Sequence, residues 1–183
     1  MIVANKILSV VGLDHDLKAI IVAFRGSANL KNWLTDANIL KAHYHNQGHC
    51  KKCEVHKGFQ NSYLKQVNGG LSKAIEDALA GYPEYEVILT GHSLGGAVAD
   101  LAAFDFANAG HHRSFRLYTF GQPRVGNQKY ADAVSTAISN HFRVVHKKDI
   151  VPHKPAYFIS FRHSGSEVWY LNGPTSPYQI CSE

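Results

Sequence analysis

Short runs of apolar and β-branched residues alternate with longer amphipathic stretches along this chain. Strands are predicted where such runs lie between polar or glycine-containing turns, at residues 7–11, 18–24, 40–44, 87–90, 115–120 and 141–146. The first two runs flank a polar turn and predict a hairpin, and residues 19–24 are apolar throughout, as in a strand covered on both faces. A terminal hairpin is predicted from strands 157–161 and 167–171, around Gly165.

Helical periodicity fills the spaces between several of these strands. Helices are predicted at residues 28–37, 57–80, 97–106 and 127–140. In the longest of them an apolar residue recurs every fourth position from Phe59 to Leu79, although Gly69 and Gly70 weaken its middle. Because strands and helices alternate through the middle of the chain, we predict an α/β fold with a mainly parallel sheet and helices on both faces.

Length and composition indicate one globular domain over residues 1–183, since no repeat, low-complexity tract or linker divides the chain. No apolar run reaches the roughly 18 residues of a membrane span. Residues 1–12 lack a basic n-region and a cleavage site, and are interpreted as a strand rather than a signal peptide. The net charge of +5 is scattered, which argues against a nucleic-acid partner but is compatible with weak attraction to an anionic lipid or polysaccharide surface.

The strongest chemical signal is a serine between a predicted strand and a predicted helix. Residues 91–95 read G-x-S-x-G, with Ser93 at the centre, directly after the strand at 87–90. In a strand–turn–helix context this pattern is typical of a nucleophile elbow, in which glycines permit a cramped turn. The alternative is a glycine-rich turn that carries a surface serine.

A serine nucleophile needs an acid that orients a base, and donors for the oxyanion. Asp149 follows the strand at 141–146 and is the candidate acid; its alternative role is a loop carboxylate paired with a neighbouring lysine. Asp100 and Asp105 lie inside the elbow helix and are expected to point elsewhere. The backbone N–H of Leu94 and the N–H or hydroxyl of Ser27 are the candidate oxyanion donors, each worth about 3 kcal/mol to the transition state.

The base is harder to assign from the chain alone. His153 lies only four residues after Asp149, beside prolines, and is too close to reach Ser93. His163 is the better candidate by position, whereas His92, adjacent to the serine on a sharp turn, is expected to pack or hydrogen-bond within the fold.

The predicted helix at 28–37 has two interpretations. Leu30, Trp33, Leu34 and Ala37 have the spacing of one helical face. The helix is either packed on the core like other surface helices or a lid that opens on an apolar surface.

Three cysteines are present, of which Cys50 and Cys53 form a C-x-x-C motif among four histidines between residues 43 and 56, and Cys181 has no evident partner. Zinc ligation is one interpretation of the motif. No second C-x-x-C or H-x₃₋₅-H unit accompanies it, so a local disulfide or two free thiols explains it more simply. We therefore predict neither a metal nor another cofactor.

Five sequence blocks occur in an order that resembles the class 3, fungal-type triacylglycerol lipase family, which includes feruloyl esterases: residues 22–27, 32–33, 91–97, 121–127 and 149–152. The resemblance covers residues 18–170. It implies an α/β-hydrolase fold with Ser93 as nucleophile, Asp149 as triad acid, Ser27 and Leu94 as oxyanion positions, and a lid containing Leu30, Trp33 and Leu34. It also implies a Cys50–Cys53 disulfide, as in some secreted members, an extracellular location, and an ester or lipid substrate met at a lipid–water interface.

Two departures from the family pattern set further expectations. Members carry a helical region before the first strand, and their catalytic histidine lies several tens of residues past the aspartate, whereas this sequence ends at Glu183. His163 matches a shared position that is not the triad base. We therefore expect a chain truncated at both ends, with weak activity or none by itself.

The sequence thus predicts a serine carboxylic-ester hydrolase that acts on acylglycerols or related esters through an acyl-enzyme. Two alternatives stay open: a catalytically dead, lipase-like binding protein, and a metal-binding module built on residues 43–56.

Overall fold

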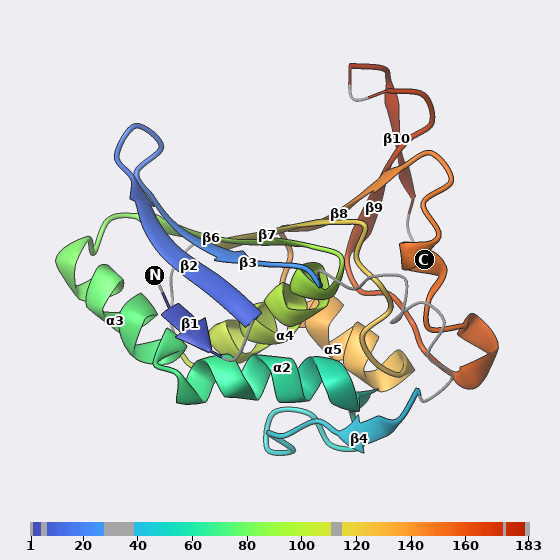
Figure 1. Ribbon diagram of the computed structural model, residues 1–183, viewed down its shortest axis with the longest axis horizontal. Coiled ribbons are helices and arrows are strands. Elements are labelled where there is room, and N and C mark those ends of the chain that lie inside the picture. The colour runs from blue at the N-terminus through green and yellow to red at the C-terminus, as the bar shows by residue number, and fades with distance from the viewer. Residues whose placement is uncertain (1, 5–6, 28–38, 111–114, 174, 182–183) are drawn as a thin grey trace.

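A computed structural model describes residues 2–4, 7–27, 39–110, 115–173 and 175–181. Within them, one mixed sheet runs in the order β1-β2-β3-β6-β7-β8-β9-β10 (Figure 1). Its strands are β1 (Ile2–Ala4), β2 (Ile7–Asp14), β3 (Ala19–Phe24), β6 (Glu86–His92), β7 (Phe115–Phe120), β8 (His141–His146), β9 (Ser166–Tyr170) and β10 (Tyr178–Cys181). The five strands β3, β6, β7, β8 and β9 are parallel, and antiparallel pairs close both edges.

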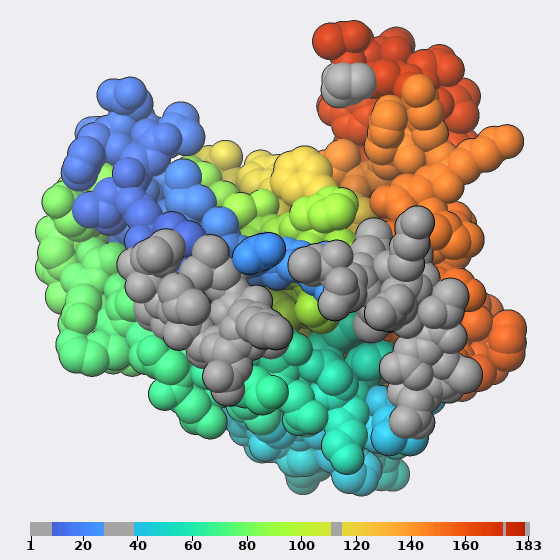
Figure 2. Space-filling model, in the orientation of Figure 1, coloured from blue at the N-terminus to red at the C-terminus, as the bar shows by residue number. Residues whose placement is uncertain are grey.

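The described α-helices lie together on one face of this sheet (Figure 1). They are α2 (Lys57–Asn68), α3 (Leu71–Gly81), α4 (Leu94–Asn108) and α5 (Gln128–Ala137). The expectation of helices on both faces is therefore not met within the described residues. The middle strands form a lower surface between the raised β2–β3 turn and the raised β9–β10 hairpin (Figure 2).

The burial of alternate strand residues reflects this one-sided cover. Ile20 and Val22 of β3, and Val87 and Leu89 of β6, are fully buried beneath the helices, whereas the residues between them are half-buried. The adjacent helix α4 is apolar around most of its circumference and is almost wholly buried. A helix that is apolar on most sides belongs in the centre of a fold. The N-terminus of α4 fixes the turn that carries Ser93, which we call the serine turn.

The predicted helix at 57–80 is divided into α2 and α3 at Gly69 and Gly70. Gly70 adopts the left-handed conformation, with φ of 98°. The amide of Gly69 donates to the carbonyls of Lys65 and Gln66 and closes α2. The apolar stripe continues across the break, which explains why periodicity alone predicts a single helix.

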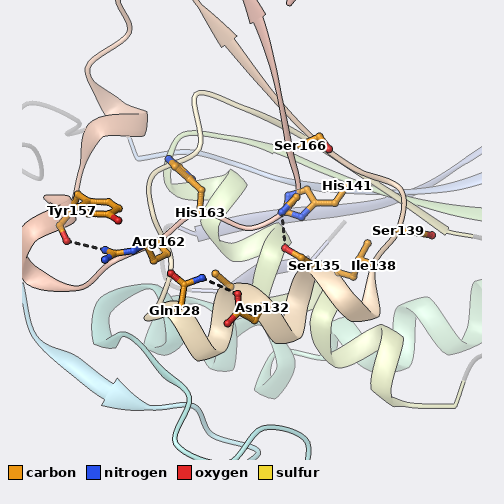
Figure 3. A pocket seen from close by; sticks show the side chains of 12 residues that line it. Gln128, Asp132, Ser135, Ile138, Ser139, His141, Tyr157, Arg162, His163 and Ser166 are labelled. Atoms are coloured by element: carbon orange, nitrogen blue, oxygen red, sulfur yellow. Dashed lines mark hydrogen bonds between the residues drawn. The ribbon is translucent and has the colours of Figure 1, made fainter. Parts of the chain in front are cut away.

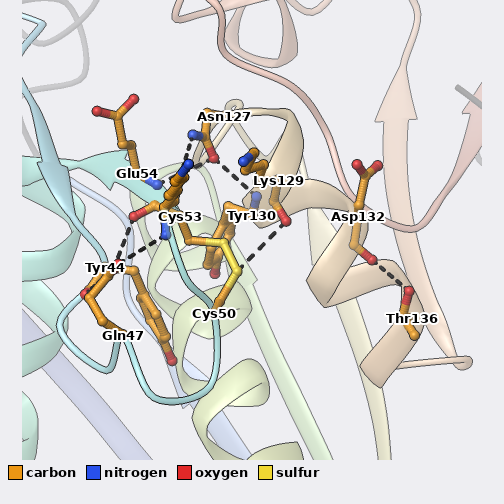
Figure 4. The surroundings of a disulfide bond; sticks show 11 residues. Tyr44, Gln47, Cys50, Cys53, Glu54, Asn127, Lys129, Tyr130, Asp132 and Thr136 are labelled. Carbon is orange, nitrogen blue, oxygen red and sulfur yellow. Dashed lines mark hydrogen bonds between the residues drawn. A yellow bond between two sulfur atoms is a disulfide. The ribbon is translucent and has the colours of Figure 1, made fainter.

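A small hairpin of β4 (Lys41–His43) and β5 (Glu54–His56) lies beside the helices and carries the disulfide Cys50–Cys53. This disulfide is the pairing that the family resemblance implies. Asn127 links the hairpin to α5: its side-chain oxygen accepts from the amides of Tyr130 and Glu54, and its side-chain amide donates to the Lys52 carbonyl (Figure 4). Asn127 therefore caps α5 and fixes the hairpin at once.

The predicted strand at 157–161 is wrong. The connection from β8 to β9 instead forms two 3₁₀-helices, η1 (Val151–His153) and η2 (Tyr157–Ile159). Ser160 ends η2 with φ of 63°, which a strand residue does not adopt. The predicted partner strand does form, as β9, but it pairs with β8 and β10.

None of the helices in the described ranges is long and apolar enough to cross a membrane. The predicted lid residues Leu30, Trp33 and Leu34 lie outside the described residues.

Candidate active site

Ser93 occupies a tight turn between the end of β6 and the start of α4. Its backbone has φ of 56° and ψ of −125°, a region that costs a residue with a side chain on the order of 1–3 kcal/mol. The Ser93 amide donates to the Phe120 carbonyl at 2.9 Å, which holds the turn against the end of β7. The side chain is buried, and its hydroxyl has no hydrogen-bond partner among the described residues.

The glycines that flank Ser93 are required by close backbone contacts. A Cβ on Gly91 would lie 2.3 Å from the carbonyl oxygen of Gly95, and a Cβ on Gly95 would lie 2.1 Å from that of Phe24. Both distances are far inside van der Waals contact. The strand, turn and helix can pass this close together only because both positions lack a side chain.

The residues expected to stabilise an oxyanion border the same turn. Leu94 is the first residue of α4, where backbone N–H groups have no intrahelical acceptor and the helix dipole favours negative charge. After β3 the chain runs against the turn at Gly26, where an added Cβ would lie 2.7 Å from the His92 carbonyl oxygen and 3.6 Å from Ser93 Cβ. Ser27 is the next residue.

Asp149 follows β8 and approaches the same end of β7. Its Oδ1 accepts from the Val151 amide at 3.0 Å. Its Oδ2 faces Gly121, where an added Cβ would lie 2.6 Å from that oxygen. The Ser93 amide is hydrogen-bonded to Phe120, and the Asp149 carboxylate lies against the next residue, Gly121. The candidate nucleophile and the candidate acid therefore both contact the turn that follows β7. No ion pair joins Asp149 to a lysine within the described part of the chain.

The histidines differ in their surroundings. His163 is buried, and its Nε2 donates to the Pro152 carbonyl at 2.8 Å. Burial, followed by the charge of Arg143, lowers the pKa of His163 well below its usual value. His92 lies near Asp149, since its Nε2 would be 3.6 Å from a Cβ added to Gly121. No described imidazole is hydrogen-bonded to the Ser93 hydroxyl.

Asp100 is fully buried on α4 and, as predicted, no described hydrogen bond joins it to Ser93. Its carboxylate accepts from the Tyr130 hydroxyl at 2.7 Å, the Ser164 hydroxyl at 2.7 Å and the Gln122 amide at 3.3 Å. Burial raises the pKa of Asp100, while these hydrogen bonds and the charge of Arg143 oppose the rise. Gln122 directly follows Gly121, so this network joins α4 to the turn after β7, against which the Asp149 carboxylate lies.

The neighbouring cavity of about 620 Å³ does not contain the candidate nucleophile in its wall. It lies beside α5 and is lined by residues such as Ser135, His141, Arg162 and His163 (Figure 3). His163 therefore belongs to the α5 side of the molecule, and no described contact joins it to Ser93.

Comparison with known proteins identifies the family of the chain. The profile of the family described as "Lipase (class 3)" matches residues 21–158. The chain belongs to the class 3 lipase family. It is 38% identical over 159 residues to a protein named secreted mono- and diacylglycerol lipase A from Penicillium cyclopium, with 87% of this chain and 50% of that protein aligned. A lipase from Rhizomucor miehei is 38% identical over 168 residues, which cover 90% of this chain and 45% of the relative.

Solved structures of such lipases share the fold. The triacylglyceride lipase of Rhizomucor miehei superposes with a TM-score of 0.88 at 36% identity, over 98% of this chain and 68% of its own. A triacylglycerol lipase described as having a serine protease triad as its catalytic centre superposes with a TM-score of 0.90 at 36% identity, over 99% and 68%. The fold is therefore that of the α/β-hydrolases. This chain spans about half the length of the sequence relatives it matches.

Proposed function

We propose that this chain carries the nucleophile, the acid and the oxyanion donors of a lipase-type serine ester hydrolase. The single observation on which the proposal rests is Ser93 itself, held at φ of 56° between β6 and α4, with a buried hydroxyl at the N-terminus of a helix. Its substrates are acylglycerols or related carboxylic esters. The class 3 family and the names of the relatives support this substrate class.

In the proposed reaction the Ser93 Oγ forms a bond to the ester carbonyl carbon while an imidazole takes its proton. The carbonyl oxygen becomes an oxyanion held by the Leu94 N–H and by Ser27. The bond from carbon to the alcohol oxygen then breaks, the alcohol takes the proton, and water releases the acyl group from Ser93 by the same steps. Asp149 orients the imidazole and stabilises its charged form.

The location that we propose is extracellular. Relatives of this chain are named secreted lipases, and the Cys50–Cys53 disulfide is the kind of bond that persists in oxidising surroundings. Leu30, Trp33 and Leu34 are proposed as the lid that covers the substrate groove. Contact with the substrate at a lipid–water interface is also part of this proposal.

A fluorophosphonate probe and p-nitrophenyl butyrate test the assignment. Because no described imidazole bonds to Ser93, both assays include added imidazole as an external base. We expect one covalent adduct per chain, mapped to Ser93 by mass spectrometry, and ester hydrolysis above the level of the Ser93→Ala protein. Ser72→Ala, which removes an exposed serine of α3, is the matched control. Labelling at another residue, or equal hydrolysis by the wild-type and Ser93→Ala proteins, contradicts the proposal.

A further inference from the structure

The connection from β8 to β9 presents an aromatic side chain almost fully to solvent. Phe158, in η2, is 87% exposed, and its neighbour Tyr157 is 58% exposed. This segment stands at the right-hand edge of the molecule, in orange-red (Figure 1). Burying an aromatic ring of this size in an apolar medium is strongly favourable, so such exposure calls for an explanation.

The backbone that presents Phe158 is fixed by two arginines. One Arg124 guanidinium nitrogen donates to the carbonyls of His153 and Pro155, at 2.9 and 3.0 Å. One Arg162 guanidinium nitrogen donates to the carbonyls of Tyr157 and Phe161, both at 2.9 Å, and the Arg162 group lies 3.4 Å from the centre of the Tyr157 ring (Figure 3). The ring of Phe158 is therefore held outward by a braced turn.

Phe158 borders an open apolar cavity whose charged groups are all cationic. The cavity has a volume of about 570 Å³, and we call its lining the Phe158 surface: Ile39, Lys41, Lys154, Ala156, Phe158, Ile159 and Phe161. Lys41 extends over the ring of Phe161, at 5.2 Å from the ring centre. Neither Lys41 nor Lys154 has a carboxylate within ion-pair distance in the described ranges.

We propose that the Phe158 surface docks on an anionic lipid surface, with Phe158 inserted among the acyl chains and Lys41 and Lys154 at the headgroups. An exposed aromatic residue on a surface that also contains two lysines, in a chain with a net charge of +5, matches the apolar interior and negative headgroups of such a surface. A second copy of the chain fits less well, because a symmetric interface brings the same lysines of both copies together.

This inference rests on the proposed function, because the docking surface would hold the proposed hydrolase on the lipid that contains its substrate. Most residues of the Phe158 surface, those from Lys154 to Phe161, belong to the same β8–β9 connection as Asp149. In the proposal, docking through this connection holds the chain at the surface where its substrate lies. Binding itself does not require Ser93, which allows the two proposals to be tested apart.

Co-sedimentation with phosphatidylcholine vesicles, with and without phosphatidylglycerol, measures the binding. We expect binding to the anionic vesicles, little to the neutral ones, and weakening by salt. Phe158→Ser is expected to reduce the affinity about tenfold. The double variant Lys41→Gln/Lys154→Gln is expected to reduce it about 25-fold, because each lysine near an anionic surface contributes roughly fivefold.

Matched controls separate the proposal from general effects. Leu17→Ser removes an apolar residue that is 62% exposed on the β2–β3 turn, and Lys65→Gln/Lys129→Gln removes two exposed lysines elsewhere. Both controls, and Ser93→Ala, are expected to bind as the wild type does. Thermal unfolding of every variant verifies that the chain is folded.

The proposal is overturned by equal binding to neutral and anionic vesicles, by no binding, or by wild-type binding of the Phe158 and double-lysine variants. It is also overturned if sedimentation without lipid shows a dimer that Phe158→Ser dissociates, since the occupant is then a second copy. Loss of probe labelling at Ser93 with vesicle binding retained contradicts the proposed function alone, and the reverse result contradicts docking alone.

Discussion

The carboxylate of Asp149 lies so close to the backbone of Gly121 that no side chain fits between them. A Cβ on Gly121 would be 2.6 Å from Asp149 Oδ2, and Gly121 has φ of 54°. We predict that Gly121→Ala destabilises the protein by about 3 kcal/mol, from steric conflict added to left-handed strain. Gly110→Ala is the control, because φ there is 76° and nothing lies within 4 Å of its Cβ, so only the strain of about 1 kcal/mol remains.

A double-mutant cycle isolates the contact with Asp149. In an Asp149→Ala background the steric conflict is absent, so Gly121→Ala is expected to cost no more than Gly110→Ala does. The free energies of unfolding from urea titrations give the coupling between the two positions. Additive effects of Gly121→Ala and Asp149→Ala would show that the carboxylate does not lie against this turn.

Gly95 provides a second steric prediction, at the elbow itself. Gly95→Ala places a methyl group 2.1 Å from the Phe24 carbonyl oxygen, at the end of a strand paired on both sides. The carbonyl cannot retreat without breaking the sheet, so we expect a loss of about 3 kcal/mol or more in unfolding free energy. Gly81→Ala is the control, since it adds a Cβ in open space at the end of α3 and is expected to be neutral or slightly stabilising. A well-folded Gly95→Ala protein would contradict the described elbow.

How far these features follow from the sequence depends on whether their causes are local. The elbow is predictable because one short segment contains its strand, its glycines and its helix. The position of Asp149 near the elbow can be predicted from strand order, because the carboxyl ends of parallel strands lie at the same edge of a sheet. The wrong strand at 157–161 has a non-local cause: its residues are β-prone, but the hydrogen bonds that Arg162 donates to the carbonyls of Tyr157 and Phe161 fold them into a turn. The sequence does not predict the partners of Asp100 for a similar reason, because Gln122, Tyr130 and Ser164 come from distant segments, although an acid inside an apolar helix is itself a signal.

Asp100 gives a prediction on the buried network behind the serine. Asp100→Ala leaves the hydroxyls of Tyr130 and Ser164 and the Gln122 amide without this acceptor. It also removes a buried carboxylate whose charge interacts with Arg143, although Arg143 keeps Glu167 as an ion-pair partner at 3.3 Å. We expect a loss of about 4 kcal/mol in unfolding free energy, as for other broken buried charge networks. Asp77→Ala removes an exposed carboxylate paired with Lys73 and should change the free energy of unfolding little, because solvent screens such a pair. Equal losses in the two variants would contradict the network.

The pair of His45 and Asp105 makes stability depend on pH. Burial acts to lower the pKa of His45, but the hydrogen bond to Asp105, at 2.9 Å, and its charge raise the pKa above the usual 6.5. Burial likewise acts to raise the pKa of Asp105, but hydrogen bonds from His45, Tyr44 and Tyr63 lower it below 3.8. The histidine contribution is complete below pH 6.5 and is lost as pH rises through the raised pKa. The aspartate contribution is present above pH 3.8 and is lost as pH falls through the lowered pKa.

His45→Gln tests this dependence through a difference between two proteins. Unfolding free energies measured at about pH 5.5 and about pH 8.5 should show the wild type exceeding the variant more at the lower pH. The buried His141 and His163 also titrate, with lowered pKa values, but they contribute equally to both proteins and cancel in the difference. Asp105→Asn should remove the same pH-dependent excess, because His45 then has no charged partner. If the difference in unfolding free energy between wild type and His45→Gln were the same at both pH values, Asp105 would not stabilise protonated His45 in the folded protein.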